Sequence, residues 1–368
     1  MIILNKSSES KRIKVHTGYT CNSNCQFCYY LARIHEPLLP EELLLEEIKL
    51  ARRLNWEDID FTGGEPTIVP YLERLISTAK AVGFKDIAII TNGIRLVDKE
   101  YFTKLRNAGL NDVLFSLHGA NSQIHDSLTR VPGSFNRITS AIEIAKELGI
   151  KIRTNLTINT LNYKTLPDYA ELVSKLGVHT VNFIFFNPWT TKNVELTKLM
   201  PKFSDAIPYL EKALDILEAN KIPKVNIRYV PYCVLQEKYR KYICDFKDRV
   251  YDQDEWAEPF SSFSEWLASK ISKKLQSNKK TKIPNIYLAY YKFAVYSYGG
   301  TLINNLRNSP NMLVPSLLAK QEAYQASAAN SFDLKKETCK TCIYFDRCDG
   351  IKKEYATLVG TEEFKPIK

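Results

Sequence analysis

Residues 12–230 of this 368-residue chain repeat one pattern, in which a short apolar segment is followed by a longer amphipathic one. The apolar segments predict strands at 12–19, 58–62, 86–91, 111–117, 151–158, 179–186 and, as a further strand, 224–230. The amphipathic segments predict helices at 40–55, 70–83, 98–108, 134–148 and 163–176. Strands that alternate with helices favour a parallel sheet, and runs such as DIAII and VNFIFF predict strands buried on both faces. The predicted fold is therefore α/β, a partial (β/α)6 TIM-like barrel with a parallel sheet and with ligands at the carboxyl ends of its strands.

Glycines support the predicted helix ends. Gly83, Gly109, Gly149 and Gly177 each follow one of the amphipathic segments closely. Glycine just past the last helical turn is a common C-terminal cap. The four glycines therefore agree with the helix boundaries that the periodicity gives.

The eight cysteines of the chain are the next constraint. Dense disulfides are typical of small secreted domains, whereas this chain is long and 45% hydrophobic, enough to bury a core without them. The N-terminal stretch MIILNKSSESKRIKVH turns polar too early for a signal peptide, and no segment has the roughly 18 uninterrupted apolar residues of a membrane helix. We therefore expect a cytoplasmic protein without a membrane partner, whose reduced cysteines hold a metal or do redox chemistry.

Three cysteines lie close together in TCNSNCQFCYY, directly after the first predicted strand: Cys21, Cys25 and Cys28. A closed zinc site needs four ligands. His16 or His35 would have to supply the fourth, but both lie outside the compact loop, and no second C-x2-C follows at the spacing of a zinc finger. Three thiolates on one loop suit an iron–sulfur cluster that keeps one iron open to an exogenous ligand.

The spacing C-x3-C-x2-C, with the aromatic Phe27 before the third cysteine, resembles the signature of the radical SAM superfamily. In that family the open iron of a 4Fe–4S cluster binds the amino and carboxylate groups of S-adenosylmethionine (SAM). One-electron reduction then cleaves SAM to a 5′-deoxyadenosyl radical, which abstracts hydrogen from a substrate. The resemblance implies that Cys21, Cys25 and Cys28 ligate this cluster and that Phe27 contributes to cofactor binding.

The segment FTGGEP, at the end of the second predicted strand, matches the GGEP motif of the same family. Adjacent glycines let a backbone approach a ligand closely, and a glutamate can accept a hydrogen bond from an ammonium group. In the family this motif contacts the methionine amino group of SAM. The resemblance therefore implies that role for Gly63, Gly64 and Glu65.

Weaker matches follow in the expected order. ITNG ends the third predicted strand and includes Asn92, a candidate for cofactor binding; FSLHG ends the fourth and includes Ser116, the candidate for a ribose contact. The run HDSLTRVPGSF resembles one in which the arginine pairs with the methionine carboxylate, which assigns that contact to Arg130. Alternatively Arg130 pairs with Asp126, while Asp126 and His125 cap a turn.

Asn155, in RTNLTIN on the fifth predicted strand, has two interpretations. Its side chain either faces the barrel interior or is buried and bonds to backbone.

A second group of cysteines lies near the C-terminus, in CKTCIYFDRCDGIKKEY. It resembles the C-terminal half of the SPASM or twitch extension, which holds auxiliary iron–sulfur clusters in many radical SAM enzymes. A full SPASM domain has a further cysteine where this chain has Lys352, so we expect one auxiliary 4Fe–4S cluster. Its expected ligands are Cys339, Cys342, Cys348 and Cys233, with Cys244 competing for the fourth position. A structural zinc site, or free buried thiols at Cys233 or Cys244, are the alternatives.

The sequence thus divides into a barrel at 1–231, an aromatic and basic connecting region at 232–338 and a cluster-binding segment at 339–368. The tyrosine-rich NIYLAYYKFAVYSYGG either lines a substrate entrance or, as is commoner for aromatic runs, belongs to a core. A net charge of +10 and a pI near 9.0 allow attraction to an anionic substrate or nucleic acid. No RNA-binding signature is found, so nucleic acid is not the expected partner.

We therefore predict a radical SAM enzyme that abstracts hydrogen from a peptide or small metabolite, leading to crosslinking, epimerisation, dehydrogenation or rearrangement. A flavodoxin or ferredoxin is the expected electron donor. Little sequence precedes the cysteine loop, which weakens the peptide interpretation and argues against cobalamin-dependent methyl transfer. The alternatives are an RNA-modifying radical SAM enzyme and a non-catalytic iron–sulfur electron carrier, which would not bind SAM.

Overall fold

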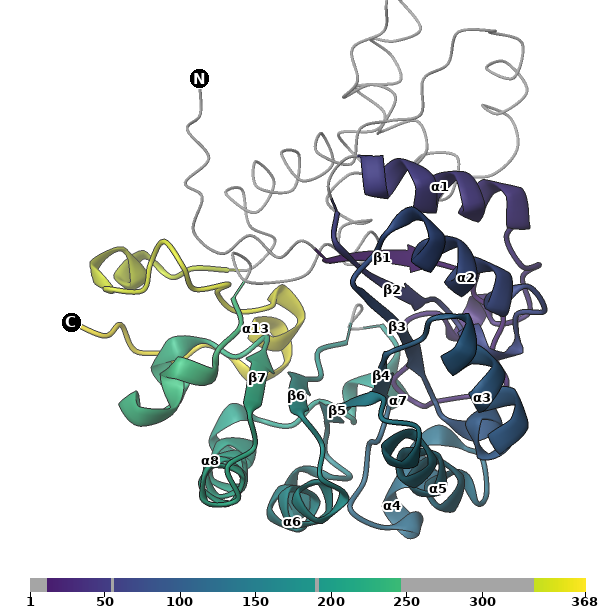
Figure 1. The fold of residues 1–368 in the computed structure, drawn as a ribbon. Helices are drawn as coiled ribbons and strands as arrows, with labels where there is room; N and C mark the ends of the chain where they lie inside the picture. Colours follow the sequence, from purple (N-terminus) through teal and green to yellow (C-terminus); the bar gives the residue numbers. More distant parts are fainter. Residues whose placement is uncertain (1–11, 54–55, 189–191, 246–333) are drawn as a thin grey trace, which may run out of the picture.

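The computed structural model describes residues 12–53, 56–188, 192–245 and 334–368. Seven parallel strands, paired in sequence order, form a half-barrel (Figure 1). The strands are β1 Arg12–His16, β2 Asp58–Thr62, β3 Asp86–Thr91, β4 Asp112–Phe115, β5 Lys151–Ile158, β6 Thr180–Phe185 and β7 Lys224–Arg228. The predicted α/β class, parallel sheet and partial barrel are confirmed, and so is the further strand predicted at 224–230.

Helices cover one face of this sheet, which we call the outer face (Figure 1). They are α1 Glu41–Arg53, α2 Leu72–Val82, α3 Lys99–Ala108, α4 Ser122–Thr129, α5 Ser134–Glu147, α6 Leu166–Leu176, α7 Val194–Thr197 and α8 Phe203–Ala219. Short 3-10 helices are η1 Leu31–Arg33, η2 Pro66–Ile68, η3 Ile94–Val97, η4 Tyr163–Thr165, η5 Tyr232–Val234 and η6 Glu237–Tyr242. The predicted helices are all present, whereas the residue patterns had not singled out α4 and α8.

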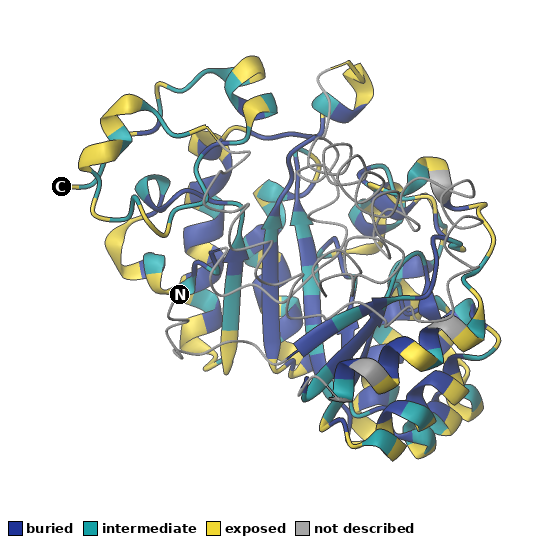
Figure 2. Ribbon diagram, turned by 90° about the horizontal axis from the view of Figure 1, so that it is seen from above, coloured by how far each residue is buried: buried dark blue, intermediate teal, exposed yellow. Residues whose placement is uncertain are grey.

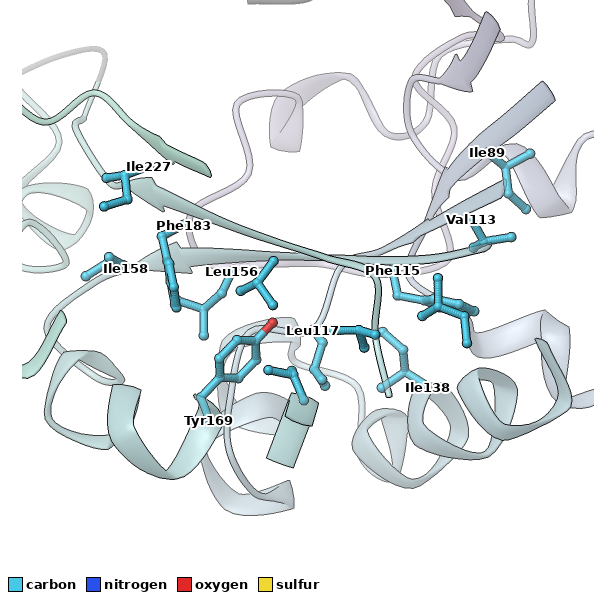
Figure 3. Close-up of a cluster of buried hydrophobic side chains, with 14 of the residues drawn as sticks. Ile89, Val113, Phe115, Leu117, Ile138, Leu156, Ile158, Tyr169, Phe183 and Ile227 are labelled. Atoms are coloured by element: carbon cyan, nitrogen blue, oxygen red, sulfur yellow. The ribbon is translucent and has the colours of Figure 1, made fainter. Parts of the chain in front are cut away.

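The core lies between the strands and the helices, where Leu156, Phe183 and Tyr169 meet (Figure 3). Figure 2 shows the strands mostly buried and the outward sides of the helices exposed. Strand β5, KIRTNLTI, alternates strictly between half-buried and buried residues, unlike the segments DIAII and VNFIFF, for which the sequence predicted burial on both faces. Its half-buried residues are polar and lie on the inner face, opposite the helices. A half-barrel leaves this inner face open to ligands, which is the physical reason for the difference.

Charged residues occupy the inner face at the amino end of the strands. The guanidinium of Arg12 lies 2.7 Å from Asp60 and that of Arg153 lies 2.9 Å from the same carboxylate. Arg153 also lies 2.6 Å from Asp112, and Arg12 lies 2.9 Å from Asp86. We call these five residues the basal charge network. It joins strands β1 to β5 at the closed end of the barrel.

The C-terminal residues 334–368 contain η8 Glu337–Thr341 and α13 Lys353–Val359 and pack beside α8 and β7 (Figure 1). Tyr355 is fully buried, and its hydroxyl accepts a 3.0 Å hydrogen bond from the backbone N–H of Phe203. The rings of Phe203, Tyr355 and Phe364 contact one another with centroids 4.8–5.7 Å apart. These contacts attach the C-terminal segment to the barrel. The tyrosine-rich run of the predicted connecting region lies outside the described residues.

Across the part of the chain that the structure describes, none of the helices has the combination of length and apolar character that crossing a bilayer requires.

Candidate active site

The loop after β1 carries Cys21, Cys25 and Cys28 at the carboxyl end of the sheet. All three thiols are free and half-buried. Donors already point at the sulfur atoms: the N–H of Ser23 lies 3.4 Å from Cys21 Sγ, and the N–H of Tyr30 lies 3.3 Å from Cys28 Sγ. The hydroxyl of Ser23 lies 3.3 Å from Cys25 Sγ. Donors placed in this way stabilise thiolates, the form that binds metal.

Burial nevertheless disfavours the charged form of these thiols. It raises the pKa of Cys21 to about 12, with the carboxylate of Glu65 as a further cause, and the pKa of Cys25 to about 11. The pKa of Cys28 is raised by burial as well. Because a bound cation removes this penalty, three desolvated thiols on one loop fit a metal cluster. Within the described residues the side chains are not placed so that three or more His, Cys, Asp or Glu converge on one metal position.

Helix α4 holds the cysteine loop from one side. The backbone N–H groups of Asn24 and Gln26 donate to the carbonyls of Thr129 and Leu128 at 3.2 and 2.9 Å. The hydroxyl of Ser23 donates to the Thr129 carbonyl at 3.2 Å. The last turn of α4 thus supplies acceptors to the loop, a role that no residue pattern predicts because it depends on backbone carbonyls.

The glycines of GGEP hold the loop from the other side. The N–H of Gly64 donates to the carbonyl of Gly18 at 2.8 Å, and the N–H of Glu65 donates to that of Thr20 at 2.9 Å. A Cβ atom on Gly64 would lie 2.1 Å from the Thr20 oxygen, and one on Gly63 would lie 2.1 Å from the Gly18 oxygen. Gly63 also has φ +129°, which favours glycine. In this structure the glycines are required because two backbones approach each other closely.

Glu65 is 1% exposed, and its carboxylate accepts four hydrogen bonds. The donors are the N–H and hydroxyl of Thr67 at 3.0 and 2.6 Å, the hydroxyl of Thr91 at 2.6 Å and the N–H of Asn92 at 2.7 Å. Burial raises the pKa of Glu65, and these hydrogen bonds oppose the rise. All four donors are uncharged, so the carboxylate gains no neighbouring cation from them. Its contact with the methionine amino group stays a prediction.

Asn92 links the third strand to the cysteine loop. Its side-chain Nδ2 donates to Asn22 Oδ1 at 2.8 Å, and Asn22 lies directly after Cys21. Ser116 follows β4; its N–H donates to the carbonyl of Thr91 at 2.8 Å, and it is half-buried. The structure therefore brings Glu65, Asn92 and Ser116 together at the edge that carries the cysteines. The ligand contacts predicted for them are not tested by these data.

Successive contacts between aromatic and imidazole rings connect the cysteine loop to α5. Phe27 is 9% exposed, and its ring lies edge-on to that of His118 at 4.6 Å. His118 stacks on His125 at 6.2 Å, and the Nδ1 of His125 accepts the N–H of His118 at 3.1 Å. Burial, together with the neighbouring histidine, lowers the pKa of His118 to about 3, and burial lowers the pKa of His125 to about 4. Both imidazoles are therefore neutral near pH 7 and act as structural hydrogen-bonding groups.

Arg130 ends α4 in the left-handed conformation, with φ +55°, directly beside the cysteine loop. Its alternative partner Asp126 is occupied elsewhere, because it accepts from the N–H of Gly133 and of Phe135 and from the hydroxyl of Ser134 at 2.7–2.9 Å. Asp126 thus accepts hydrogen bonds at the start of α5, whereas the capping of a turn that the sequence predicted for Asp126 together with His125 is not what these contacts show. No ion pair of the exposed Arg130 is found among the described residues. The structure therefore gives no support to its pairing with Asp126.

The C-terminal cysteines lie beside Cys233, on η5 just after β7. Burial raises the pKa of the Cys233 thiol to about 11, and the nearby Cys348 and Cys339 raise it further. Tyr232 stacks on Tyr344 with ring centroids 4.2 Å apart. Cys339 and Cys348 thus lie close enough to act on the charge of Cys233, and ligation of a cluster by these cysteines or by Cys342 stays a prediction.

Cys244, the competing ligand, is anchored near the same place. Its N–H donates to Ile227 at 2.8 Å. The next residue, Asp245, pairs with Arg347 at 2.8 Å, directly beside Cys348. Cys348 and Cys339 contribute to the raised pKa of Cys233, and ligation by Cys233 or by Cys244 stays a prediction.

Comparison with known proteins gives a consistent result. A family model described as Radical SAM superfamily matches residues 15–183. GTP 3′,8-cyclase of Aquifex aeolicus is 29% identical over 282 residues, covering 68% of this chain and 87% of that protein. Probable GTP 3′,8-cyclase of Saccharolobus islandicus is 28% identical over 211 residues, 57% of this chain and 66% of the relative. The chain thus spans about two thirds of the length of the Saccharolobus relatives that it matches.

Among solved structures, Streptococcus suis SuiB bound to S-adenosylmethionine is similar in fold, with a TM-score of 0.54 at 14% identity. The match covers 97% of this chain and 76% of SuiB. It supports the fold and says nothing about the substrate. The cysteine signature and the half-barrel agree with the family match, so residues 15–183 of this chain are similar to the radical SAM superfamily.

Proposed function

We propose that this enzyme cleaves SAM reductively at the loop of Cys21, Cys25 and Cys28 and abstracts hydrogen from a small metabolite, a purine nucleotide being favoured. The observation that carries the proposal is the set of three free, desolvated thiols held between α4 and GGEP. That arrangement lies at the carboxyl end of a parallel sheet, where ligands of such barrels bind.

When bound, the reduced cluster supplies one electron that breaks the sulfonium C–S bond of SAM, giving methionine and a 5′-deoxyadenosyl radical that becomes 5′-deoxyadenosine by taking a substrate hydrogen atom. The chain's own residues orient SAM. We assign the methionine amino group to Gly63, Gly64 and Glu65, the carboxylate to Arg130 and the ribose to Ser116. Glu65 is suited to this role because it is buried among uncharged donors, so that an ammonium group would add the missing opposite charge.

Two observations favour a nucleotide over the peptide that the sequence left open. The curated relatives reported above are GTP 3′,8-cyclases, and one of them is covered over 87% of its length. The net charge of +10 suits an anionic substrate. The peptide alternative rests only on general properties of radical SAM enzymes with a SPASM or twitch extension. The similarity to SuiB concerns the fold alone.

The auxiliary cluster and the electron donor complete the proposal. Cys233, Cys339, Cys342 and Cys348 are its proposed ligands, and the effect of Cys348 and Cys339 on the pKa of the Cys233 thiol supports this choice. A flavodoxin or ferredoxin in the cytoplasm would supply the single electron. No contact or motif described above specifically supports the two alternatives, RNA modification and simple electron transfer.

The test is anaerobic reconstitution with iron and sulfide, followed by dithionite reduction with SAM and GTP. We expect about eight irons per chain and 5′-deoxyadenosine formed in step with loss of GTP. With ribose-deuterated GTP, deuterium should appear in the 5′-deoxyadenosine. Deoxyadenosine formation that GTP and other purine nucleotides leave unchanged would refute the nucleotide assignment, and an absence of SAM binding would favour the electron carrier.

A separate variant tests the auxiliary site. Replacing Cys339, Cys342 and Cys348 by alanine should remove about four irons. Loss of zinc in place of iron would refute the auxiliary iron–sulfur cluster.

A further inference from the structure

Three asparagines stand side by side on neighbouring strands of the half-barrel. In the strand register, Asn155 of β5 pairs with Asn182 of β6, and Asn182 pairs with Asn226 of β7. We call these three residues the asparagine row. Adjacent strands lie about 4.8 Å apart, so the row extends across about 10 Å.

The row lies on the inner face. Leu156 and Phe183, which follow Asn155 and Asn182 in the chain, point into the core between the sheet and the helices (Figure 3). Successive side chains of a strand point to opposite faces, so the asparagines point away from the helices. Hydrogen bonds fix two of them: Asn226 Nδ2 donates to Asn182 Oδ1 at 2.8 Å, and Asn182 Nδ2 donates to the carbonyl of Thr154 at 3.1 Å.

Some donors and acceptors of the asparagine row have no hydrogen-bond partner among the described residues. Among the described residues, no partner is found for the half-buried carboxamide of Asn155 or for Oδ1 of Asn226. Nearby, at the end of β6, Asn187 is 5% exposed and its Oδ1 also has no partner there. Buried polar groups are normally paired, so the unmet oxygen of Asn187, close to two half-buried amides with free hydrogen-bonding capacity, points to a ligand in this region.

The row lies between the two groups of cysteines. Phe115 pairs with Thr154, so Ser116 adjoins Asn155, and the same edge continues to Asn92, which bonds to the cysteine loop. On the other side, β7 leads directly to η5, which carries Cys233. A substrate over the asparagine row would therefore have the proposed SAM site on one side and the proposed auxiliary cluster on the other.

We propose that the asparagine row binds the base of the substrate purine nucleotide, an inference that rests on the proposed function. A carboxamide presents a donor and an acceptor in one plane and pairs in a bidentate manner with the edge of a purine. Uncharged amides suit an uncharged base better than a phosphate, which favours guanidinium and ammonium groups. The row therefore determines which base is accepted.

The experiment measures binding of GTP and of ATP to the anaerobically reconstituted enzyme with SAM present, by equilibrium dialysis. Asn155→Ala and Asn226→Ala should each weaken binding of the preferred nucleotide about tenfold, the effect of losing an amide contact. The nearly isosteric Asn155→Asp should weaken it further, because it adds a charge of the same sign as the nucleotide. Asn136→Ala, on the exposed side of α5, is the matched control and should bind as the wild type does.

Iron content and thermal unfolding establish that each variant is folded and loaded. If folded row variants bind both nucleotides as tightly as the wild type, the inference is overturned even though the enzyme cleaves SAM. A wild type that cleaves SAM but binds neither nucleotide also overturns it. A wild type that forms no 5′-deoxyadenosine under any condition refutes the proposed function itself.

Discussion

The two ends of the half-barrel contain the same kinds of buried polar residue in opposite electrostatic settings. At the amino end, the carboxylates of the basal charge network face guanidinium groups at 2.6–2.9 Å. At the carboxyl end, the four donors to the buried carboxylate of Glu65 are uncharged, and Oδ1 of the buried Asn187 has no partner among the described residues. Paired charges need no ligand, whereas desolvated unpaired groups gain by binding one. The amino end is therefore built for stability and the carboxyl end for binding.

Asp60 and Glu65 show the contrast in a single pair of residues, since each is 1% exposed. Burial would raise the pKa of both. At Asp60 the charges of Arg153 and Arg12 outweigh burial and lower the pKa to about 2, while at Glu65 the pKa stays raised. Glu65 would thus be the group that gains from an incoming ammonium group, as the proposed SAM contact requires.

The largest effect is expected from Gly64→Ala. The added Cβ would lie 2.1 Å from the Thr20 carbonyl oxygen, so the backbone that leads into the cysteine loop must shift. We expect SAM cleavage to be lost and about four irons fewer after reconstitution. Gly149→Ala is the control: it has φ +63° but no atom within 4 Å of the added Cβ, so only backbone strain of about 1–2 kcal/mol is expected. Iron content equal to that of the wild type in Gly64→Ala would contradict the account.

Asp60→Ala should lower the free energy of unfolding and leave iron binding at the carboxyl end of the sheet unchanged. It leaves two guanidinium groups without their shared carboxylate, and breaking a buried pair costs about 3–5 kcal/mol in the free energy of unfolding. Denaturant titration measures the loss, with Glu100→Ala, in an exposed ion pair with Lys104, as a control near zero. Folded Asp60→Ala should still take up iron at the cysteine loop. A failure of folded protein to do so would show that the two ends are not separate.

Acid should destabilise the fold through His118 and His125 before it affects Asp60. Because the folded pKa values of the histidines lie below the unfolded value of about 6.5, the unfolded state binds more protons, and stability falls as the pH drops from 6.5 toward 4. The slope approaches about 1.4 kcal/mol per pH unit for each histidine. The contribution of Asp60 is present above its unfolded pKa of about 3.9 and is lost only as the pH falls toward 2.

Unfolding measured from pH 7 to 4 checks this order. The double variant His118→Asn with His125→Asn should flatten the profile. An unchanged slope in that variant would assign the acid sensitivity to other groups.

The smallest effect concerns the docked C-terminal segment. Tyr355→Phe removes the acceptor of the Phe203 N–H and the hydroxyl that bonds to Glu363. We expect a loss of about 1–3 kcal/mol, because a buried N–H is left unsatisfied. Hydrogen exchange at Phe203 should increase while exchange in β4 stays as in the wild type. Equal protection in both proteins would mean that this contact does not hold the segment in place.

The sequence predicted the positions of the strands and of most helices, and the parallel partial barrel, because these depend on local periodicity. VNFIFF predicted β6, and Gly83 and Gly177 cap their helices with positive φ, as expected. The hydrogen bonds from the cysteine loop to the carbonyls of Leu128 and Thr129 could not be predicted from the sequence, because every residue has a backbone carbonyl.

Residues that depend on register were harder to predict. Asn182 and Asn226 became candidate site residues only because strand pairing places them beside Asn155. His118 was recognised as part of the site only because its ring contacts that of Phe27. The GGEP glycines have a second reason, the contact between two backbones, which the motif did not predict. Long-range pairing, which no local pattern encodes, accounts for each of these differences.

The central claim is that the carboxyl end cleaves SAM through Cys21, Cys25 and Cys28. The most direct measurement is 5′-deoxyadenosine formed anaerobically from SAM and dithionite by the reconstituted wild type and by the variant with all three cysteines replaced by alanine. The account predicts 5′-deoxyadenosine from the wild type and none from the variant, which should keep about four irons at the auxiliary site. Undiminished 5′-deoxyadenosine from the triple variant would contradict it.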